Sequence, residues 1–413
     1  MNGGDLLSKV IVIGGGPAGM MAAIAASDKH EVILLEKNEK LGKKLFITGK
    51  GRCNITNAKE ISEFFNYIPG NPYFLYSALY TYTNEDTIKF FEDLGVKLKV
   101  ERGDRVFPTS DKSSDIIGAF QRELERRKIK VLLNSSVKKM IYENNKIKAV
   151  FLSNDKIING DYFILCTGGM SYPRTGSTGE GLSFAKELGH NIVTPRPSLI
   201  PITSSEDWIK DLQGLSLKNV ELSIVDSKGK SLFKDFGEML FTHFGISGPL
   251  VLSASGVVRE NLKLKAVIDL KPALGFDELD KRVQSDFAKY SNKDFRNSLD
   301  ELLPKKLIDV VVRLSEIDED KKVNLITREE RKNLVKLLKN FTLSITGVRP
   351  IEEAIVTSGG IDTKEIDPST MQSKVIENLY FAGEVIDVDA YTGGYNIQIA
   401  LSTGFLAGSR VGE

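Results

Sequence analysis

The fold is decided by residues 9–36, whose sequence is KVIVIGGGPAGMMAAIAASDKHEVILLE. The segment 9–13 predicts a strand buried on both faces, because its run Val-Ile-Val-Ile is β-branched and apolar and is bounded by glycines. The alanine-rich segment 17–27 predicts a helix, and 31–35 predicts a second strand. A strand, a helix and a strand in this order form a βαβ unit with parallel pairing and a right-handed crossover. We therefore predict an α/β protein with a Rossmann-like domain.

The turn between the first strand and the helix fits the pattern GxGxxG through Gly14, Gly16 and Gly19. The first glycine makes a tight turn, the second lets the backbone approach a pyrophosphate, and the third allows close packing of helix and strand. Glu36 lies roughly 20 residues further on, where a carboxylate accepts hydrogen bonds from ribose hydroxyls. An acid at this position disfavours the 2′-phosphate of NADP. The pattern predicts a dinucleotide whose pyrophosphate lies at the helix N-terminus.

Length and composition exclude several other classes of protein. The chain has 413 residues, enough for two or three domains. Lys and Arg total 56 and Asp and Glu total 55, and a net charge of +1 argues against a nucleic-acid or membrane-surface partner. Two cysteines and three histidines argue against a disulfide scaffold or a metal site and favour a cytoplasmic location. We expect no metal and no membrane-spanning segment.

The order of the segments predicts a discontinuous first domain. Prolines at 195, 197 and 201 indicate a crossing between domains, and the sequence at 380–383 returns to the strand-then-glycine pattern of the N-terminal part. We predict a nucleotide-binding domain over 1–193 and 355–413 with an insertion over 194–354. The insertion is predicted to be β-rich over 194–271 and about 341–354, and helical over 272–340.

Three further glycine-containing segments are candidate cofactor contacts. They are LGKKLFITGKGRCNITN at 41–57, CTGG at 166–169, and LYFAGEVIDVDAYTGGYN at 379–396, which opens a helix. A helix N-terminus beside a flavin would stabilise the negative charge that develops on reduction. An NAD-only dehydrogenase stays an alternative, but it leaves 381–408 without a role. A chain that returns to its nucleotide domain after a long insertion is typical of two-part FAD enzymes.

With these motifs in view, the sequence resembles the BaiN-type, aminoacetone-oxidase-like family of bacterial FAD-dependent oxidoreductases. The resemblance rests on GGGPAG at 14–19, TGKGRCNITN at 48–57, TGGMSYPRTGSTGEG at 167–181, LFTHFGISGP at 240–249 and FAGEVIDVDAYTGGYNIQIA at 381–400. It implies FAD, an FAD-binding domain of the two-dinucleotide-fold type, and an inserted β-rich and helical cap. The family usually has a bulky aromatic residue where this chain has Ile399.

The candidate site residues come from these segments. The candidate cofactor-binding residues are Gly14, Gly16, Pro17, Ala18, Gly19, Glu36, Lys37, Lys44, Gly51, Arg52, Cys53, Asn54, Val137, Thr167, Gly168, Gly169, Gly383, Glu384, Gly394, Tyr395, Asn396 and Ile397. A redox role for Cys53 lacks a CxxC partner, so we expect this residue to line the cofactor site. His243 lies in a loop with glycines and a proline and is the candidate catalytic acid or base.

We therefore predict an FAD-dependent oxidoreductase that transfers a hydride through flavin N5 to or from a small organic substrate. The sequence contains no second GxGxxG in a βαβ context, so we expect no dedicated NAD(P)H domain. The candidate partners for the second half of the reaction are NAD(P)H, as a transient electron donor, and oxygen. A flavin-containing RNA-modification or regulatory protein stays a second alternative. The expected partner is a small molecule rather than a nucleic acid or a membrane, and the sequence does not predict an oligomeric state.

Overall fold

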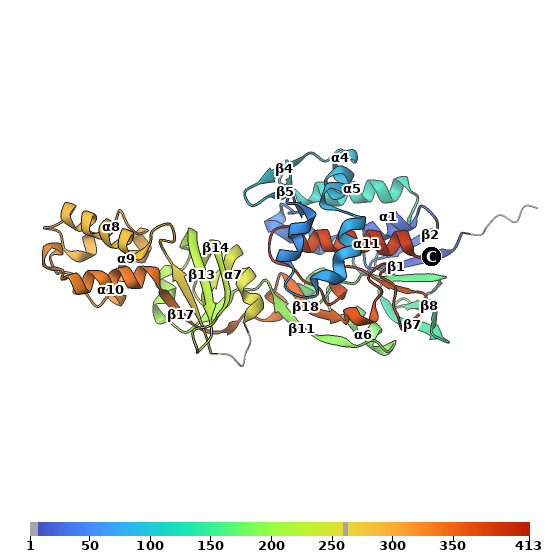
Figure 1. Cartoon of the computed structure of the whole chain (residues 1–413). Coiled ribbons are helices and arrows are strands. Elements are labelled where there is room, and N and C mark those ends of the chain that lie inside the picture. Colours follow the sequence, from blue (N-terminus) through green and yellow to red (C-terminus); the bar gives the residue numbers. More distant parts are fainter. Residues whose placement is uncertain (1–6, 259–262) are drawn as a thin grey trace, which may run out of the picture. The chain divides into compact units, whose positions relative to one another are not determined.

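A computed structural model describes residues 7–258 and 263–413, and the chain divides into two compact units. The nucleotide unit comprises Met1–Ser198 and Ile351–Glu413, and the inserted unit comprises Leu199–Pro350 (Figure 1). The predicted boundaries at 193/194 and 354/355 differ from these by a few residues. The physical reason is that β11 (Ile192–Ser198) pairs antiparallel with β18 (Val356–Ile361), so both strands belong to the nucleotide unit.

The nucleotide unit is built on a five-stranded parallel sheet. Its strand order is β19-β10-β1-β2-β6, with β19 at Leu379–Phe381, β10 at Tyr162–Leu165, β1 at Lys9–Ile13, β2 at Glu31–Leu35 and β6 at Lys130–Leu132. The predicted first βαβ unit is confirmed, since β1 pairs in parallel with β2 in register from Lys9 opposite Glu31. The returning segment pairs with β10 as β19 and so completes one edge of the sheet.

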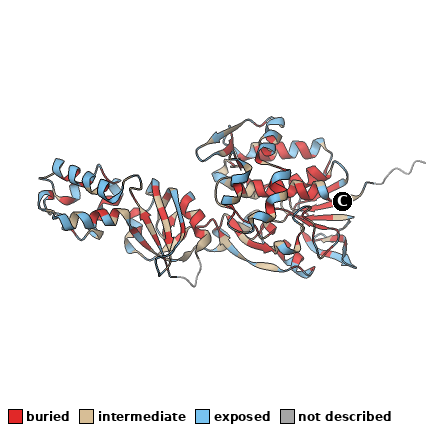
Figure 2. Cartoon of the chain, viewed as in Figure 1, coloured by how far each residue is buried: buried red, intermediate tan, exposed pale blue. Residues whose placement is uncertain are grey.

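Two helices pack against each other close to the glycine turn. They are α1 (Pro17–Ala26) and α11 (Tyr395–Arg410), and Figure 2 shows both as largely buried. An added Cβ on Gly404 would lie 2.3 Å from the backbone oxygen of Ala18, and one on Gly408 would lie 2.3 Å from that of Ala22. The two glycines therefore allow the second half of α11 to touch the backbone of α1.

Smaller elements complete the nucleotide unit. The helices are α2 (Lys43–Ile47), α3 (Tyr76–Thr81), α4 (Asn84–Asp93), α5 (Ser113–Arg126) and α6 (Glu180–Glu187). The strands are β3 (Thr56–Asn57), β4 (Leu98–Glu101), β5 (Arg105–Pro108), β7 (Val137–Glu143), β8 (Lys146–Leu152) and β9 (Ile157–Asn159). The predicted hairpin turns of β7–β9 are confirmed, because Asn144, Asn145 and Asp155 have φ values of 49°, 58° and 63°.

The inserted unit contains a closed β-barrel, and its helices lie in sequence between the barrel strands β15, β16 and β17. The barrel order is β12-β15-β14-β13-β16-β17, formed by Ile202–Ser204, Gly245–Ser247, Ser231–Thr242, Ser216–Val225, Leu264–Asp269 and Phe341–Val348. The helices are α7 (Pro249–Ala254), α8 (Phe276–Lys289), α9 (Lys305–Leu314) and α10 (Arg328–Lys339). Within the two described ranges of the chain, no helix is both long enough and apolar enough to cross a bilayer.

Candidate functional site

The candidate residues of the nucleotide unit gather where the parallel strands end. Gly14 follows β1, Glu36 follows β2, Thr167 lies just after β10, and Gly383 lies just after β19. The carboxyl ends of neighbouring parallel strands lie along one edge of a sheet, which is where open α/β folds bind their ligands. Residues from three distant parts of the sequence, around 14–36, 167 and 383, therefore meet at one edge.

The three glycines of the GxGxxG turn differ in what surrounds them. An added Cβ on Gly14 would lie 2.4 Å from the Cys166 backbone oxygen, and one on Gly19 would lie 1.8 Å from the Gly14 oxygen. Both glycines are required by the packing of the chain itself. At Gly16, by contrast, an added Cβ would meet nothing within 4 Å, and φ is an ordinary −79°. The space beside Gly16 is therefore open, as a bound pyrophosphate needs.

The N-terminus of α1 presents its backbone to this open space. Pro17 occupies the first helical turn, and Gly16 as the cap residue provides no side-chain hydrogen bond. Unsatisfied N–H groups at a helix start, together with the helix dipole, bind anions. The returning chain reaches this point as well, since an added Cβ on Gly383 would lie 2.8 Å from the Ala18 side chain. Gly16, Pro17, Ala18 and Gly383 thus lie together.

Glu36 is buried and already holds the turn in place. One carboxylate oxygen accepts a hydrogen bond from the Gly15 N–H at 2.8 Å. The other accepts from the backbone and side-chain nitrogens of Asn38 at 2.7 and 2.6 Å. A carboxylate has acceptor positions for about four hydrogen bonds, so one remains for a ribose hydroxyl. The sequence predicted only the ligand role of Glu36 and missed its role in fixing the Gly15 backbone.

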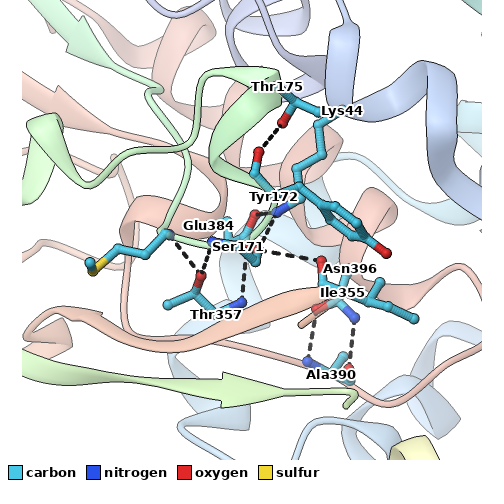
Figure 3. A network of polar contacts seen from close by, with 10 residues as sticks. Lys44, Ser171, Tyr172, Thr175, Ile355, Thr357, Glu384, Ala390 and Asn396 are labelled. Atoms are coloured by element: carbon cyan, nitrogen blue, oxygen red, sulfur yellow. Dashed lines mark hydrogen bonds and ion pairs between the residues drawn. The ribbon is translucent and has the colours of Figure 1, made fainter. Parts of the chain in front are cut away.

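A polar network joins Lys44 to the returning segment (Figure 3). The Lys44 ammonium donates to the Ser171 hydroxyl at 2.6 Å and lies 2.5 Å from a Glu384 oxygen. The other Glu384 oxygen accepts from the Ser171 hydroxyl at 3.0 Å and from the Thr357 N–H at 2.7 Å. The Lys44 and Glu384 side chains are only 21% and 20% exposed, so the ion pair is screened less than a surface pair. The network ties α2 to β18 and to the segment after β19.

The residues after β10 pack against this network. An added Cβ on Gly169 would lie 2.5 Å from the Thr357 hydroxyl, and one on Gly168 would lie 3.1 Å from the Ser177 hydroxyl. The Lys37 ammonium donates to the Thr178 hydroxyl, in the same segment, at 2.7 Å.

The candidate residue Val137 is the first residue of β7, and its side chain is buried.

The loop at 48–57 has an unusual backbone. Gly49, Lys50, Gly51 and Cys53 all have φ between 56° and 84°, a left-handed conformation that costs energy in a residue with a side chain. Burial raises the pKa of the Cys53 thiol to about 12, so it is protonated at neutral pH and unsuited to redox chemistry.

Arg52 in the same loop is committed to partners within the protein. Its guanidinium donates to Asp111 at 2.8 Å and to Glu101 at 2.5 Å, and it lies 4.3 Å from the centre of the Phe107 ring. These two carboxylates raise the pKa of the Arg52 guanidinium and balance its charge. Arg52 is one of the candidate cofactor-binding residues, and that role stays a prediction. The structure places its side chain in a network with β4 and β5.

The N-terminus of α11 lies against the end of this loop. An added Cβ on Gly394, whose φ is 100°, would lie 2.3 Å from the Thr56 backbone oxygen. Tyr395 is buried and stacks on Tyr67 at 4.5 Å between ring centres, whereas Ile397 is half-buried. The Asn396 side chain accepts from the Ala390 N–H and donates to the Ala390 oxygen, which closes the preceding loop (Figure 3).

Two orphaned polar atoms belong to candidate residues and test whether a cofactor fits. The side-chain oxygens of Asn54 and Thr167 are buried and have no hydrogen-bond partner among the described residues. Buried polar atoms are normally paired, so such atoms indicate an unrecorded ligand or water. With the open space at Gly16 and the uncapped start of α1, they fit a bound FAD. No group of three His, Cys, Asp or Glu side chains in the described ranges is arranged to hold a metal ion.

Asp387 is a further carboxyl group of the returning segment. It accepts a hydrogen bond from the Asn71 amide at 3.1 Å. Burial, followed by the nearby carboxylates of Asp389 and Asp362, raises its pKa above the ordinary aspartate value.

His243 lies on an exposed turn between β14 and β15 of the inserted unit. Its ring contacts Phe244, with 5.0 Å between ring centres. The glycines around it have a role within the barrel itself. An added Cβ on Gly245 would lie 2.1 Å from the Ile202 backbone oxygen, and one on Gly248 would lie 3.0 Å from the Met239 Cα. The glycine pattern that singled out His243 is therefore explained by barrel packing, and its catalytic role stays a prediction.

A parallel sheet with an open glycine turn at an uncapped helix start defines a dinucleotide-binding Rossmann protein. A model of the family described as HI0933-like protein Rossmann domain matches residues 8–410. The chain belongs to this family, and it is an FAD-dependent oxidoreductase. The predicted family resemblance, fold class and enzyme class are thereby confirmed.

Individual relatives and structures add detail. A 3-dehydro-bile acid delta(4,6)-reductase from Clostridium scindens is 30% identical over 98% of this chain and 100% of its own length. A ribosomal RNA dihydrouridine synthase from Haemophilus influenzae is 32% identical over 96% of this chain and 97% of its own length. A structure of quinol-fumarate reductase with menaquinol molecules aligns with 97% of this chain and 70% of its own, with 16% identity and a TM-score of 0.51, which indicates a shared fold.

Proposed function

We propose that this protein reduces a carbon–carbon double bond that is conjugated to a carbonyl group. The observation that carries the proposal is the chemistry shared by two relatives that align over nearly their whole lengths. One is named for reducing delta(4,6) double bonds of a 3-dehydro, and hence 3-oxo, bile acid. The other is named for making dihydrouridine, in which the ring double bond next to a carbonyl is saturated. Conjugation makes the far carbon of such a bond electrophilic.

The reaction balances as addition of one hydride and one proton. The carbon–carbon π bond breaks, a hydride is added to the carbon β to the carbonyl, and a proton is added to the α carbon. FAD, when bound and reduced, supplies the hydride, and NAD(P)H supplies the electrons. The chain offers no second dinucleotide turn of the GxGxxG type in a βαβ context. We therefore infer that the nicotinamide donor and the substrate use the flavin in turn.

The remaining roles are binding of the cofactor and supply of the proton. Gly16 and Ala18, at the start of α1, hold the pyrophosphate, and Glu36 holds the adenosine ribose. The N-terminus of α11 at Gly394 favours negative charge on the flavin by about 0.3–1 kcal/mol through its dipole. For the proton, the sequence-based proposal is His243. Asp387 is a second candidate, because it is a half-buried carboxyl group of the returning segment and burial raises its pKa above the ordinary aspartate value.

Anaerobic stopped-flow spectroscopy tests this proposal. Holoprotein reduced by NADH or NADPH should be reoxidised by a 4-en-3-oxo steroid, and mass spectrometry should find the product two hydrogens heavier. The saturated 3-oxo steroid serves as the matched control and should leave the flavin reduced. Reoxidation by oxygen alone, with no conjugated substrate accepted, would contradict the proposal and favour an oxidase.

Uridine within ribosomal RNA is the second candidate substrate, favoured by the name of the Haemophilus influenzae relative. It conflicts with the expectation that the protein has no nucleic-acid partner. The net charge of +1 provides little general attraction to RNA. Filter binding with ribosomal RNA fragments, followed by nucleoside analysis for dihydrouridine after incubation with NAD(P)H, decides between the two. Turnover of RNA but of no free enone would replace the small-molecule proposal.

A further inference from the structure

A fully buried amide lies directly behind the candidate cofactor site. Gln398 belongs to the first turns of α11 and is 0% exposed. Its side-chain oxygen accepts from the hydroxyls of Thr56 at 2.7 Å and Thr87 at 2.8 Å. Its side-chain nitrogen donates to the Tyr82 backbone oxygen at 3.2 Å and to the Ser402 hydroxyl at 3.0 Å. All four hydrogen-bonding positions of the amide are therefore used.

The orientation of this amide is fixed by its surroundings. The Ser402 hydroxyl donates to the Tyr82 oxygen at 2.6 Å, so both Tyr82 and Ser402 present acceptors to Gln398. Only the amide nitrogen can face them, because an amide oxygen turned that way would meet a backbone oxygen without a proton between them. The oxygen of Gln398 must then point to Thr56 and Thr87. Such a fully satisfied network holds its members in one arrangement.

Two of the joined elements belong to the candidate cofactor site. Thr56 ends the left-handed loop that contains Cys53 and Asn54, and its backbone oxygen is in contact with Gly394 at the start of α11. The next residue, Asn57, donates its side-chain amide to the Gly393 oxygen at 3.0 Å. The other partner of the Gln398 oxygen, Thr87, lies in α4, none of whose residues is a candidate cofactor-binding residue.

We propose that Gln398 is a positioning residue for the cofactor. By holding Thr56, it fixes the loop at 48–57 against the N-terminus of α11, so that both present their backbone groups to the flavin in one geometry. This proposal rests on the assignment of these two segments to FAD, and not on which double bond is reduced. Its test therefore uses cofactor retention and flavin spectra, and it can fail while the proposed reductase activity stands.

The two threonines provide a matched pair of variants. Thr56→Val and Thr87→Val each remove one hydroxyl that donates to the same oxygen, both residues are 0% exposed, and valine has nearly the same shape. We expect similar decreases in melting temperature for both. Purified Thr56→Val holoprotein should release FAD about tenfold faster on dilution, a factor that corresponds to about 1.4 kcal/mol, and should show a shifted flavin absorbance band. Thr87→Val holoprotein should release FAD at a rate within about twofold of the wild-type rate.

Gln398→Glu adds a readout that simple loss of packing would not give. A carboxylate can accept from both threonines but cannot donate to Tyr82 or Ser402, whereas the protonated acid can donate once. Burial raises the pKa of a carboxyl group, so the variant is protonated at low pH and becomes charged as the pH rises. FAD retention by Gln398→Glu should therefore fall as the pH rises, whereas FAD retention by the wild type should stay constant over the same range. Gln398→Leu should lose FAD at every pH.

A buried amide elsewhere in the nucleotide unit is the control. Asn378 makes comparable bonds to Ile147 and Asp161 at the amino end of β19, away from the candidate residues. Asn378→Leu should lower the melting temperature with FAD release unchanged. Equal loss of FAD in Thr56→Val and Thr87→Val, or in Asn378→Leu and Gln398→Leu, would overturn the proposal and make Gln398 a packing residue.

Discussion

Two glycines, Gly16 in the nucleotide unit and Gly245 in the inserted unit, belong to loops that look alike in sequence. At Gly245 the chain itself forbids a side chain, because an added Cβ would lie 2.1 Å from the Ile202 oxygen and φ is 156°. At Gly16 the chain leaves open space, and the backbone conformation suits any residue. The open space beside Gly16 fits a bound pyrophosphate, whereas Gly245 is required by the packing of the barrel. This difference separates the cofactor turn from the turn that carries His243.

The largest expected effect comes from filling the open space. Gly16→Val should fold, with a melting temperature close to that of wild-type apoprotein, but it should be purified colourless, because its side chain occupies the place of the pyrophosphate. Visible absorbance and circular dichroism measure the two properties.

The matched change in the inserted unit should have the opposite pattern. Gly245→Ala should keep FAD and lower the stability of the barrel by about 1–3 kcal/mol, through overpacking and backbone strain. A yellow Gly16→Val protein, or a colourless Gly245→Ala protein, would break the comparison between the two glycines.

The next effect concerns the source of the proton. If the His243 turn has a catalytic role besides closing the barrel, His243→Ala should keep FAD and slow turnover by about 10²–10⁴-fold. Asp387→Asn should then change turnover by less than about tenfold. Steady-state rates across pH measure both. Wild-type rates for His243→Ala, together with a large loss for Asp387→Asn, would transfer the proton donor to the nucleotide unit.

A smaller effect distinguishes two neighbouring lysines of α2. Lys44→Met leaves the half-buried Glu384 carboxylate without its cation and should lower the free energy of unfolding by about 2 kcal/mol. Lys43→Met removes an exposed i,i+4 pair with Glu39 at 3.4 Å and should change it by less than about 0.5 kcal/mol. Urea denaturation measures both values, and equal values would mean that the Lys44 network does not stabilise the site edge.

The smallest effect is an expected lack of reaction. Burial raises the pKa of Cys53 to about 12 and also raises that of Cys166, so both thiols stay protonated at neutral pH. Folded protein should therefore resist iodoacetamide up to about pH 9 and react only after unfolding. Mass spectrometry counts the alkylated sites. Rapid modification of Cys53 in the native protein would show that the loop opens in solution.

The sequence predicts the parallel sheet well because the evidence for it is local. The β-branched run at 9–13, the glycine turn and Glu36 lie within one short stretch, and hairpin turns at Asn144 and Asp155 follow from residues that tolerate positive φ. The boundary at β11 could not be predicted, because the partner strand β18 lies more than 150 residues away in sequence. Prolines marked the region of the crossing but not the last paired residue.

The candidate site was predicted in its glycines and missed in its supporting contacts. Ser171 and Gln398 lie within motifs that carry the family resemblance, but the roles of these two residues and of Thr357 follow only from which distant groups they meet. Arg52 shows the reverse case. Its sequence position suggested a cofactor contact, and the carboxylates that balance its charge, Glu101 in β4 and Asp111 just after β5, lie outside the loop sequence.

The position of the cofactor is the central claim, and an electron-density map of the holoprotein tests it most directly. The account predicts an FAD pyrophosphate beside Gly16, with phosphate oxygens about 3 Å from backbone nitrogens at the start of α1. It also predicts an adenosine ribose hydroxyl on Glu36. Water alone beside Gly16, with the flavin bound elsewhere in the chain, would contradict it.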